Sequence, residues 1–477
     1  MTSAEVVPDR GKQVSTTKEK ISAYFTIAAA AFGLISDGYQ NNLMTMTNVV
    51  LKRLYPKDYT SSVSTRVSNS LLVGAIIGQL LVGVVCDRLG RKVALVFTTL
   101  VIVLGATLGT AAHGAHGSAK GLFWFLTFAR GITGIGVGGE YPASSTSASE
   151  AANEQMLSKR GPVFIMVTNF VLSFGGPLAS SVFLIVLSIA GENHLPTVWR
   201  VCFGVGIVLP LTVLIFRLRM LSSKLYRKGA IKKRVPYRWS LSIIGDRLLA
   251  PVAHGRFLYD FVTFPNGVFS GTIISNVIHN SDIKRTAEWQ LLLSSIALPG
   301  VFIGALLCNP LGRRNTFNRR YLDDLGFSGY LVFGLIIGLA YDRITKIIPL
   351  FVVFYGLMQS SGNLNPWESL IVSSGTCYGL SAAVGKAGAA IGTQAFIPIQ
   401  NNLGKKWTFI IAAICGVTGI LVTYFFVPDM TGVDLAEEDA RFMEYLRENG
   451  WEGSIGEDED IDLIEGRGGD SDSISLK

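Results

Sequence analysis

The chain has 477 residues, of which 49% are hydrophobic and only 16% are charged, and it carries a formal net charge of +8. Its mean hydropathy is +0.41. A soluble globular protein rarely needs so much apolar material, so the composition excludes a typical soluble domain and favours a protein that spans the lipid bilayer. We expect no nucleic-acid partner.

Twelve apolar windows of membrane-spanning length follow one another along the chain. They cover residues 24–50, 68–86, 93–112, 121–143, 162–190, 199–216, 257–278, 289–308, 325–341, 347–370, 376–399 and 407–427. A polar tail precedes the first window and no A-x-A-like site follows it, so we expect no cleavable signal peptide. The sequence therefore predicts an all-α, multi-pass integral membrane protein with about twelve transmembrane helices.

Basic residues gather in the connections that follow even-numbered windows, above all in residues 217–247. Because short loops rich in Lys and Arg stay on the cytosolic side, both termini are expected in the cytosol. Lys52, Arg53 and Lys57 on the opposite side dilute this bias. The expected organisation is a cytosolic N-terminal tail (1–22), a six-helix half (23–220), a basic cytosolic linker (221–250), a second six-helix half (251–428) and an acidic cytosolic tail (429–477).

Two patterns that indicate ligand sites in other proteins are interpreted here as packing. Gly134, Gly136 and Gly139 have the G-x-G-x-x-G spacing of a dinucleotide-binding loop, but an apolar run of membrane-spanning length contains them, so they lie inside a hydrophobic helix. The five cysteines are isolated in or beside apolar segments, with no C-x-x-C pair. We therefore expect neither a metal nor a cofactor.

A short repeat links the two halves of the chain. The segment "GVVCDRLGRK" (83–92) follows the second window, and "GALLCNPLGRR" (304–314) follows the eighth. Internal symmetry of this kind is typical of secondary transporters. Because a cationic turn can hydrogen-bond neighbouring helix ends and Asp87 can pair with an arginine, we expect a gating latch. Its residues are Gly83, Asp87, Arg88, Gly90 and Arg91. For the second copy, basic loop ends that merely obey the positive-inside rule explain the pattern equally well.

The first copy of this repeat is the loop motif of the major facilitator superfamily, and further segments resemble its phosphate:proton symporter branch. These segments are "SDGYQNNL" (36–43), "RGITGIGVGGEYPASSTSASE" (130–150) and "YGLSAAVGKAGAAIGTQAF" (378–396). Together with "FLYDFVTFPNGVFSGTI" (257–273), they look most like the fungal glycerophosphodiester permeases, which import glycerophosphoinositol or glycerophosphocholine. The resemblance implies two pseudo-symmetric six-helix halves around a central cavity that opens alternately to each side.

Charged residues inside the expected spans are the candidates for proton coupling. A charge at the bilayer centre costs at least about 2.5–3.5 kcal/mol, so such residues face a partner or a watery cavity. We expect Arg130 to pair with Asp37, with the glycines of residues 131–139 allowing a close helix approach. The resemblance places a titrating carboxylate at Glu140 and a substrate-facing hydroxyl at Tyr141. Low-dielectric surroundings favour the protonated acid, which can carry a proton through the cycle; the alternative for Glu140 is a charge at a helix end.

The expected substrate site centres on Lys386. An ammonium among Ala and Gly on a pore-lining helix needs a negative partner, and a substrate phosphate can supply it. The alternative is a permanent pair with Asp260, and the two interpretations are compatible if substrate and Asp260 exchange as partners. Asn169 and Asn363 offer neutral hydrogen bonds to phosphate or glycerol hydroxyls, although either could equally be a helix–helix contact.

Several departures from the phosphate symporters bear on the substrate. Gln40 stands where they tend to have a second acid, and Tyr378 stands where they usually have a histidine, which favours a singly charged diester with an organic arm. Arg256 replaces an expected aromatic residue and is either a second phosphate ligand or an accident. Residues 316–324 resemble an insertion, and residues 367–378 lack the usual basic loop. These two segments reflect either real divergence or faulty exon boundaries that leave the protein inactive.

The function predicted from the sequence is proton-coupled import of glycerophosphodiesters, inorganic phosphate or both, without catalysis. The partners are then a small anionic organophosphate or phosphate, protons and the lipid bilayer, and the expected location is the plasma membrane. A proton-coupled sugar or polyol symporter is the alternative transporter, although it should need neither Lys386 nor the "GVGGEYP" segment. A non-transporting nutrient sensor that signals through the acidic tail is the alternative from another class.

Overall fold

The computed structural model describes most of the hydrophobic part of the chain. The described residues are 17–155, 160–218, 250–278, 282–308, 320–364, 375–426, 444 and 447–448. Nearly all of the expected linker and acidic tail, and the first sixteen residues of the N-terminal tail, therefore lie outside the described residues. The same holds for residues 316–319 and 367–374 of the two atypical segments. Within the described ranges the chain is helical and contains no strand.

The first six expected spans are all helical. They correspond to α1 (Thr17–Leu54), α2 (Ser61–Leu89), α3 (Arg91–Thr110), α4 (Ala119–Gln155), the continuous run of α5 (Arg160–Ile165), η3 (Met166–Phe170) and α6 (Val171–Ala190), and α7 (Leu195–Leu218). Short 3-10 turns, η1 (Ala115–Gly117) and η4 (Glu192–His194), precede α4 and α7. The side chain of Thr60 caps α2 by accepting a hydrogen bond from the Val63 amide. Gly90 separates α2 from α3 with a φ of 96°, a conformation that L side chains adopt at a cost.

The last six expected spans are also helical. They correspond to α10 (Ala250–Val268) with α11 (Ser270–Val277), α12 (Ile283–Ile296) with α13 (Leu298–Cys308), α14 (Arg320–Leu339), α16 (Ile348–Gly362), α17 (Gly375–Leu403) and α18 (Trp407–Phe426). A single turn, α15 (Tyr341–Ile344), connects α14 to α16. The prediction of about twelve membrane-crossing helices is therefore confirmed.

Two of these spans are interrupted, and neighbouring helices hydrogen-bond the carbonyls at the breaks. At the α10–α11 junction the Tyr355 hydroxyl of α16 donates to the Asn266 carbonyl at 2.5 Å. At the α12–α13 junction Asn363 Nδ2 donates to the Ala297 carbonyl at 2.9 Å. Irregular backbone at membrane depth is tolerated where protein groups bond it in this way. The first interruption belongs to a span that lines the central cavity described below, and the second is bonded by Asn363, which also lines it.

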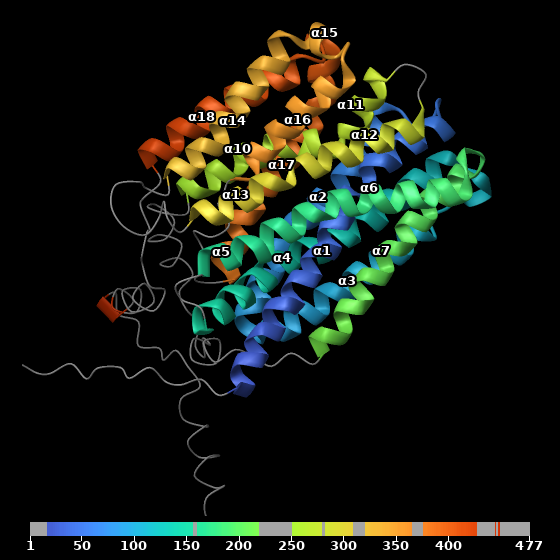
Figure 1. The fold of residues 1–477 in the computed structure, drawn as a ribbon. Coiled ribbons are helices and arrows are strands. Elements are labelled where there is room, and N and C mark those ends of the chain that lie inside the picture. Colours follow the sequence, from blue (N-terminus) through green and yellow to red (C-terminus); the bar gives the residue numbers. More distant parts are fainter. Residues whose placement is uncertain are drawn as a thin grey trace, which may run out of the picture.

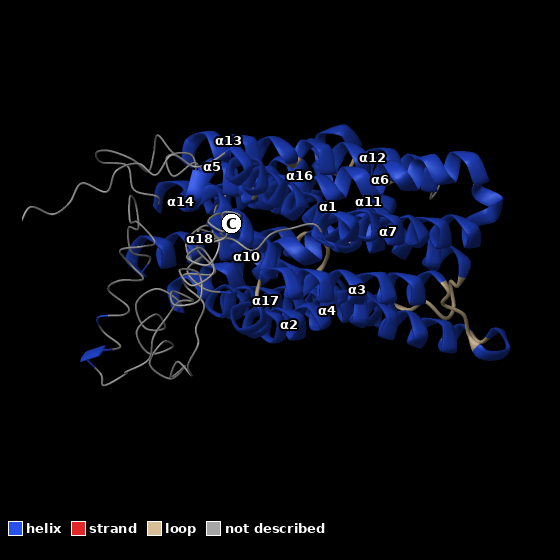
Figure 2. Cartoon of the chain, turned by 90° about the horizontal axis from the view of Figure 1, so that it is seen from below, coloured by secondary structure: helices blue, strands red, loops and turns tan. Residues whose placement is uncertain are grey.

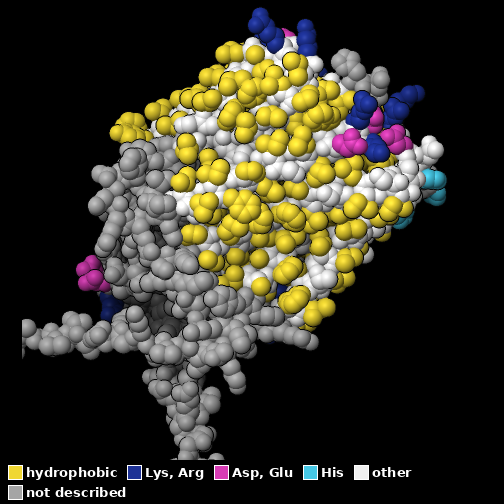
Figure 3. Space-filling view, in the orientation of Figure 1, with side chains coloured by type: hydrophobic (Ala, Val, Ile, Leu, Met, Phe, Trp, Pro, Cys, Tyr) yellow, Lys and Arg dark blue, Asp and Glu magenta, His cyan; other side chains and the backbone are white. Residues whose placement is uncertain are grey.

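The outer surface fits a lipid environment. Seven of the described helices are long and apolar enough to cross a membrane by length and composition, and α14 and α16 contain shorter apolar stretches. The helices α1, α10 and α17 do not meet that criterion because polar residues interrupt their apolar character. Hydrophobic side chains cover much of the visible face, while many of the visible Lys, Arg, Asp and Glu side chains gather near the upper-right end of the bundle (Figure 3). The chain is therefore a multi-pass integral membrane protein.

The helices form two groups that lie side by side. Those before residue 219 occupy the lower right of Figure 1 and those after residue 249 the upper left, and the helices run broadly alongside one another in both views (Figures 1 and 2). The groups meet where α2 packs on α17, α6 on α12, and α1 on α11. A Cβ added to Gly379 of α17 would lie 2.5 Å from the Gln79 carbonyl of α2, so these two helices are almost in backbone contact.

The glycines of α4 act in helix packing, as expected. A Cβ added to Gly134 would collide with the Leu71 carbonyl, and one added to Gly138 would collide with the Ala75 carbonyl, both on α2. Gly136 lies equally close to Ile102 on α3. Since small residues let membrane helices approach closely, this face holds α4 against both neighbours and leaves no room for a nucleotide.

Candidate transport site

A cavity of about 170 Å³ lies between the two groups of helices. This exceeds by far the roughly 10–15 Å³ that one water molecule requires. Helices α1, α2, α4, α6 and η3 contribute its walls on one side, and α10, α16 and α17 on the other. All five residues expected to bind substrate line it: Tyr141, Asn169, Asp260, Asn363 and Lys386. The structure thus brings together side chains that are up to 245 positions apart in the sequence, from Tyr141 to Lys386.

Lys386 is paired in this structure. Its Nζ lies 3.1 Å from Asp260 Oδ2, and both side chains are only 10% exposed. The ammonium also lies 3.8 Å from the centre of the Phe264 ring and 5.6 Å from that of Tyr141. Lys386 is thus paired with Asp260 in this conformation, as the alternative interpretation has it, and the expectation that a substrate phosphate supplies its negative partner stays a prediction. Buried charges are rarely left without a counter-charge, so a ligand anion has to compete with Asp260.

The neutral candidates lie at irregular backbone beside the cavity. Asn169 is part of η3, a single π-helical turn, and such turns recur at functional sites. Asn363 follows α16, and its Oδ1 accepts a hydrogen bond of 3.3 Å from the Tyr259 hydroxyl. Because its Nδ2 bonds the Ala297 carbonyl, Asn363 also joins α16 to the α12–α13 junction. The two roles considered for Asn363, cavity lining and helix contact, therefore coexist.

Arg256 belongs to the cavity rather than to a loop. It lies four residues before Asp260 on α10, so both side chains project from the same helix face, and both line the cavity. Its guanidinium lies 5.1 Å from the centre of the Tyr378 ring, a cation–π distance. The Tyr378 hydroxyl accepts a hydrogen bond of 3.2 Å from Ser145 of α4. Two of the departures from the phosphate symporters, Arg256 and Tyr378, thus contact each other beside the cavity.

The expected pair of Arg130 with Asp37 does not form. Arg130 Nη1 donates to the Gln40 carbonyl at 3.0 Å, and neither Asp37 carboxylate oxygen has a hydrogen-bond partner among the described residues. The reason lies in the antiparallel packing of α1 and α4. Gln40 meets Arg130, while Gly33 meets Glu140, so Asp37 lies between these levels. An unsatisfied buried polar group costs about 1–3 kcal/mol, so this conformation leaves the Asp37 carboxyl group in need of a partner.

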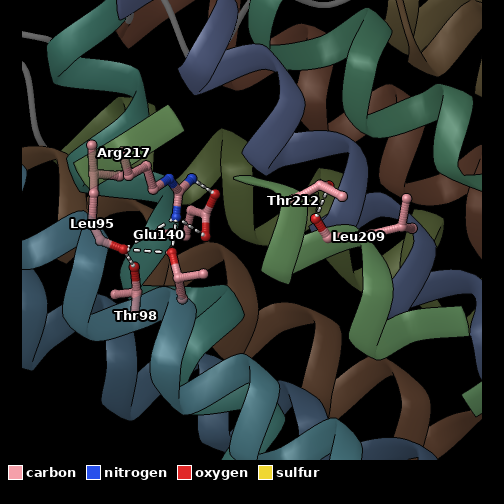
Figure 4. Close-up of polar contacts among 7 residues, drawn as sticks. Leu95, Thr98, Glu140, Leu209, Thr212 and Arg217 are labelled. Atoms are coloured by element: carbon pink, nitrogen blue, oxygen red, sulfur yellow. Dashed lines mark hydrogen bonds and ion pairs between the residues drawn. The ribbon is translucent and has the colours of Figure 1, made fainter. Parts of the chain in front are cut away.

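Glu140 instead pairs with Arg217, a residue that the sequence reasoning missed. Arg217 Nη1 lies 3.0 Å from Glu140 Oε2, and Nη2 contacts Oε1. Nη1 also donates to the Leu95 carbonyl of α3 at 3.1 Å (Figure 4). It contacts the Thr99 hydroxyl as well. Both charged side chains are 1% exposed, which rules out the helix-end alternative for Glu140. Arg217 directly follows the sixth apolar window and is the first residue of the basic run 217–247. Only its position beside an apolar run could therefore have signalled that it is buried.

The latch residues surround the turn between α2 and α3. Arg91 Nη1 donates to the Cys86 carbonyl at 2.8 Å and so bonds one of the last carbonyls of α2. Gly83 is buried, whereas Arg88 is exposed. The side chain of Asp87 and most of the second copy of the motif lie outside what the structure describes. The gating role of these residues stays a prediction.

Gln79 is a further cavity residue that sequence reasoning missed. It is fully buried on α2 and lines the cavity, and neither its amide oxygen nor its amide nitrogen has a hydrogen-bond partner among the described residues. The signal was present, because Gln79 is the one amide in the apolar stretch of residues 71–86. A polar solute in the cavity would satisfy both groups.

Two helical groups around a central polar cavity, with irregular spans beside it, define a secondary transporter with inverted or parallel repeats. Residues 23–234 and 249–442 match the family described as "Sugar (and other) transporter", and the chain belongs to this family of the major facilitator superfamily. The structure is similar to a proton:xylose symporter bound to 6-bromo-6-deoxy-D-glucose, with a TM-score of 0.70, 17% identity, and coverage of 89% of this chain and 99% of the symporter. That likeness concerns the fold alone.

Relatives with closer sequences transport other solutes. Glycerophosphoinositol permease 1 of Candida albicans is 51% identical over 460 residues, which cover 93% of this chain and 86% of the relative. Glycerophosphoinositol transporter 1 of Saccharomyces cerevisiae is 48% identical, with the same coverage. A glycerophosphocholine permease of Candida albicans is 31% identical over 97% of this chain and 91% of the relative. The predicted resemblance to the fungal glycerophosphodiester permeases is confirmed.

Proposed function

We propose that this protein imports glycerophosphodiesters together with protons by alternating access, across the plasma membrane and with both termini in the cytosol. The observation that carries the proposal is the cavity charge arrangement: Lys386 and Arg256 project into one cavity, and Lys386 is held by an exchangeable carboxylate, Asp260. A phosphodiester bears a single negative charge, so it can replace Asp260 on Lys386 without adding excess charge to a low-dielectric site. The relatives named for glycerophosphoinositol and glycerophosphocholine support this substrate class.

The organic arm of the substrate accounts for the rest of the cavity. A glycerol or inositol group presents several hydroxyls, and the amides of Gln79, Asn169 and Asn363 and the hydroxyl of Tyr259 offer donors and acceptors for them. Tyr141 and Phe264 add apolar surface around the ammonium of Lys386. Sites of this composition, apolar with a few fixed polar groups, are typical of small-molecule binding.

Proton coupling is assigned to Asp37 and Glu140. Both are buried carboxylates within the membrane-spanning part of the bundle, and neither is a lining residue of the cavity. Asp37 lies four residues before Asn41, a lining residue of α1, and Glu140 directly precedes Tyr141. Each of the helices α1 and α4 therefore carries both a buried carboxylate and a cavity-lining residue, so a change in the protonation of the carboxylate can alter the substrate site.

The decisive experiment is uptake by cells that lack their own importers. Labelled glycerophosphoinositol, glycerophosphocholine, phosphate and xylose are offered from about pH 4.5 to about 7.5, with the surface amount of the protein quantified. We expect uptake of at least one diester, rising as the pH falls. Uptake of phosphate alone would show that the chain imports phosphate rather than a diester. Uptake of xylose alone would overturn the phosphodiester assignment.

Arg256→Gln is expected to raise the KM for the diester about tenfold or more, with a smaller change in kcat, because a charge-assisted contact contributes about 1.5–3 kcal/mol. Uptake is measured against substrate concentration. Arg285→Gln is the matched control, since this arginine is 73% exposed and its i,i+3 pair with Asp282 lies outside the cavity. An unchanged KM in Arg256→Gln would exclude Arg256 as a phosphate ligand.

A further inference from the structure

We propose that Arg217 is a positioning residue that Glu140 and Asp37 share. When Asp37 loses its proton, it draws the Arg217 guanidinium away from Glu140. The contacts that hold the end of α7 then depend on the protonation state of Asp37 on α1. This inference rests on the proposed proton coupling and deepens it. It assigns to the sixth span a function in coupling, for which the sequence offered no motif.

The first support is the way in which Arg217 is held. Its guanidinium, at the end of α7, reaches two helices at once, because it bonds Glu140 of α4 and the Leu95 carbonyl of α3 (Figure 4). It also bonds the Thr99 hydroxyl of α3. The neutral acceptors on α3 would remain in place if the carboxylate partner changed. Arginine suits this role because its planar fork serves several acceptors at fixed angles.

The second support is the position of α1. A Cβ on Gly33 would collide with both Arg217 Nη2 and Glu140 Oε1, so the backbone of α1 lies directly on the ion pair. Asp37 follows Gly33 by four residues, which places it on the same face of α1, one turn away. Asp37 also lies within electrostatic range of both Glu140 and Arg217. A rotamer change of a long arginine side chain spans such a step without moving a helix axis.

The third support is the set of unused hydrogen-bonding groups. Asp37 Oδ1 and Oδ2 and Arg217 Nε are all buried and have no hydrogen-bond partner among the described residues. Buried polar groups of this kind are normally satisfied, so a donor without an acceptor beside an acid without a donor indicates a second arrangement in which they meet. In the present arrangement a proton on Asp37 takes the place of that donor.

Among the described residues, few other charged groups lie near the cluster of Asp37, Glu140 and Arg217. On α4 the next cation is Arg130, which bonds the Gln40 carbonyl three residues beyond Asp37. On α3, Arg91 and Lys92 precede Leu95 by about one turn, at the end of the bundle that carries the latch motif. Arg217 is therefore the described cation that contacts Glu140 directly and acts on Asp37.

The test follows the protonation of Asp37 itself and needs no substrate. Infrared difference titration of the purified protein, from about pH 4.5 to about 9, records the carboxylic-acid band that disappears in Asp37→Asn. The comparison is between Glu140→Gln and Glu140→Gln/Arg217→Gln. The double variant removes both charges of the ion pair. In Glu140→Gln the Arg217 guanidinium keeps its Leu95 and Thr99 acceptors and has Asp37 within electrostatic range, so both variants are expected to fold.

The expected result is an Asp37 titration midpoint that lies about one pH unit or more higher in the double variant than in Glu140→Gln, because a nearby cation favours the carboxylate. In the otherwise unchanged protein, Glu140→Gln alone should lower the midpoint, since Arg217 then serves Asp37 only. Arg200→Gln is the control, because this arginine bonds the Ala112 carbonyl at the opposite end of α7.

Equal midpoints in the two Glu140→Gln backgrounds would overturn the proposal, and so would an Asp37 band that does not titrate in this range. A second measurement, the exchange of labelled substrate across the membrane, distinguishes failure of the shared-arginine proposal from failure of the proposed transport function. Diester exchange with an unmoved Asp37 band refutes the shared arginine alone. A moved band without diester exchange refutes the substrate assignment and leaves the shared arginine in place.

Discussion

Lys386→Ala is expected to lower glycerophosphodiester uptake at least about 30-fold, measured as initial rate per transporter at the cell surface. Truncating one member of a buried charge pair costs about 2–5 kcal/mol of binding, and 1.4 kcal/mol is a factor of ten. The side chain supplies the ammonium that lies 3.1 Å from Asp260 and over the Phe264 ring, and an uncharged residue cannot make the charge-assisted contact that we propose for the substrate phosphate.

Two further variants separate binding from folding in this prediction. Lys405→Ala is the matched control, because Lys405 is exposed beyond the end of α17. The double variant Asp260→Asn/Lys386→Gln leaves no orphaned buried charge, so it should reach the surface in near-normal amounts and still fail to take up substrate. Substantial uptake by this double variant would show that the phosphate is held elsewhere, and attention would then turn to Arg256.

Gly134→Ala/Gly138→Ala is expected to eliminate most folded protein at the surface. Each added methyl group would occupy the position of a backbone carbonyl oxygen on α2, at Leu71 and at Ala75, and backbone cannot rotate away as a side chain can. With both changes on one face, α2 has to withdraw from α4 along a whole turn and lose its packing contacts. Fluorescence size-exclusion of the solubilised protein measures the folded fraction.

The control for this prediction lies on the same helix. Gly131→Ala adds the same methyl group where the nearest atom, the Ser70 carbonyl oxygen, is 3.8 Å away, an ordinary contact distance. It should therefore express as the unchanged protein does, and even gain slightly in helix propensity. Equal folded yields for the double variant and the control would contradict the assignment of these glycines to close packing.

Most of the architecture could be predicted because it follows from one-dimensional patterns. The length of an apolar window reports a membrane crossing whatever its neighbours are, and each of the twelve windows contains helix within the described residues. The glycines of residues 131–139 could be assigned to packing because their apolar flanks exclude a loop. Three of the helices that line the cavity, α1, α10 and α17, were also signalled, because polar residues interrupt their apolar character.

Pairing between charges could not be predicted in the same way. Asp37, Arg130 and Glu140 were recognised as buried charges, but their partners depend on which levels of two antiparallel helices meet, and a shift of three residues moves a side chain by about 4.5 Å. Arg217 escaped notice because an arginine after an apolar run looks like a basic loop residue. Only the packing of α7 against α1 and α3 shows that it is buried.

The sequence by itself determined the class of protein, the approximate number of spans and some of the cavity residues, among them Asp260 and Lys386. It could do so because hydrophobicity and the cost of burying charge act on each segment separately. The tertiary structure alone decided that Lys386 is held by Asp260, that Arg256 faces Tyr378, and that Glu140 is held by Arg217 rather than lying at a helix end. Electrostatic partners are set by distances of a few ångströms between helices far apart in the chain, and no pattern within one segment carries that information.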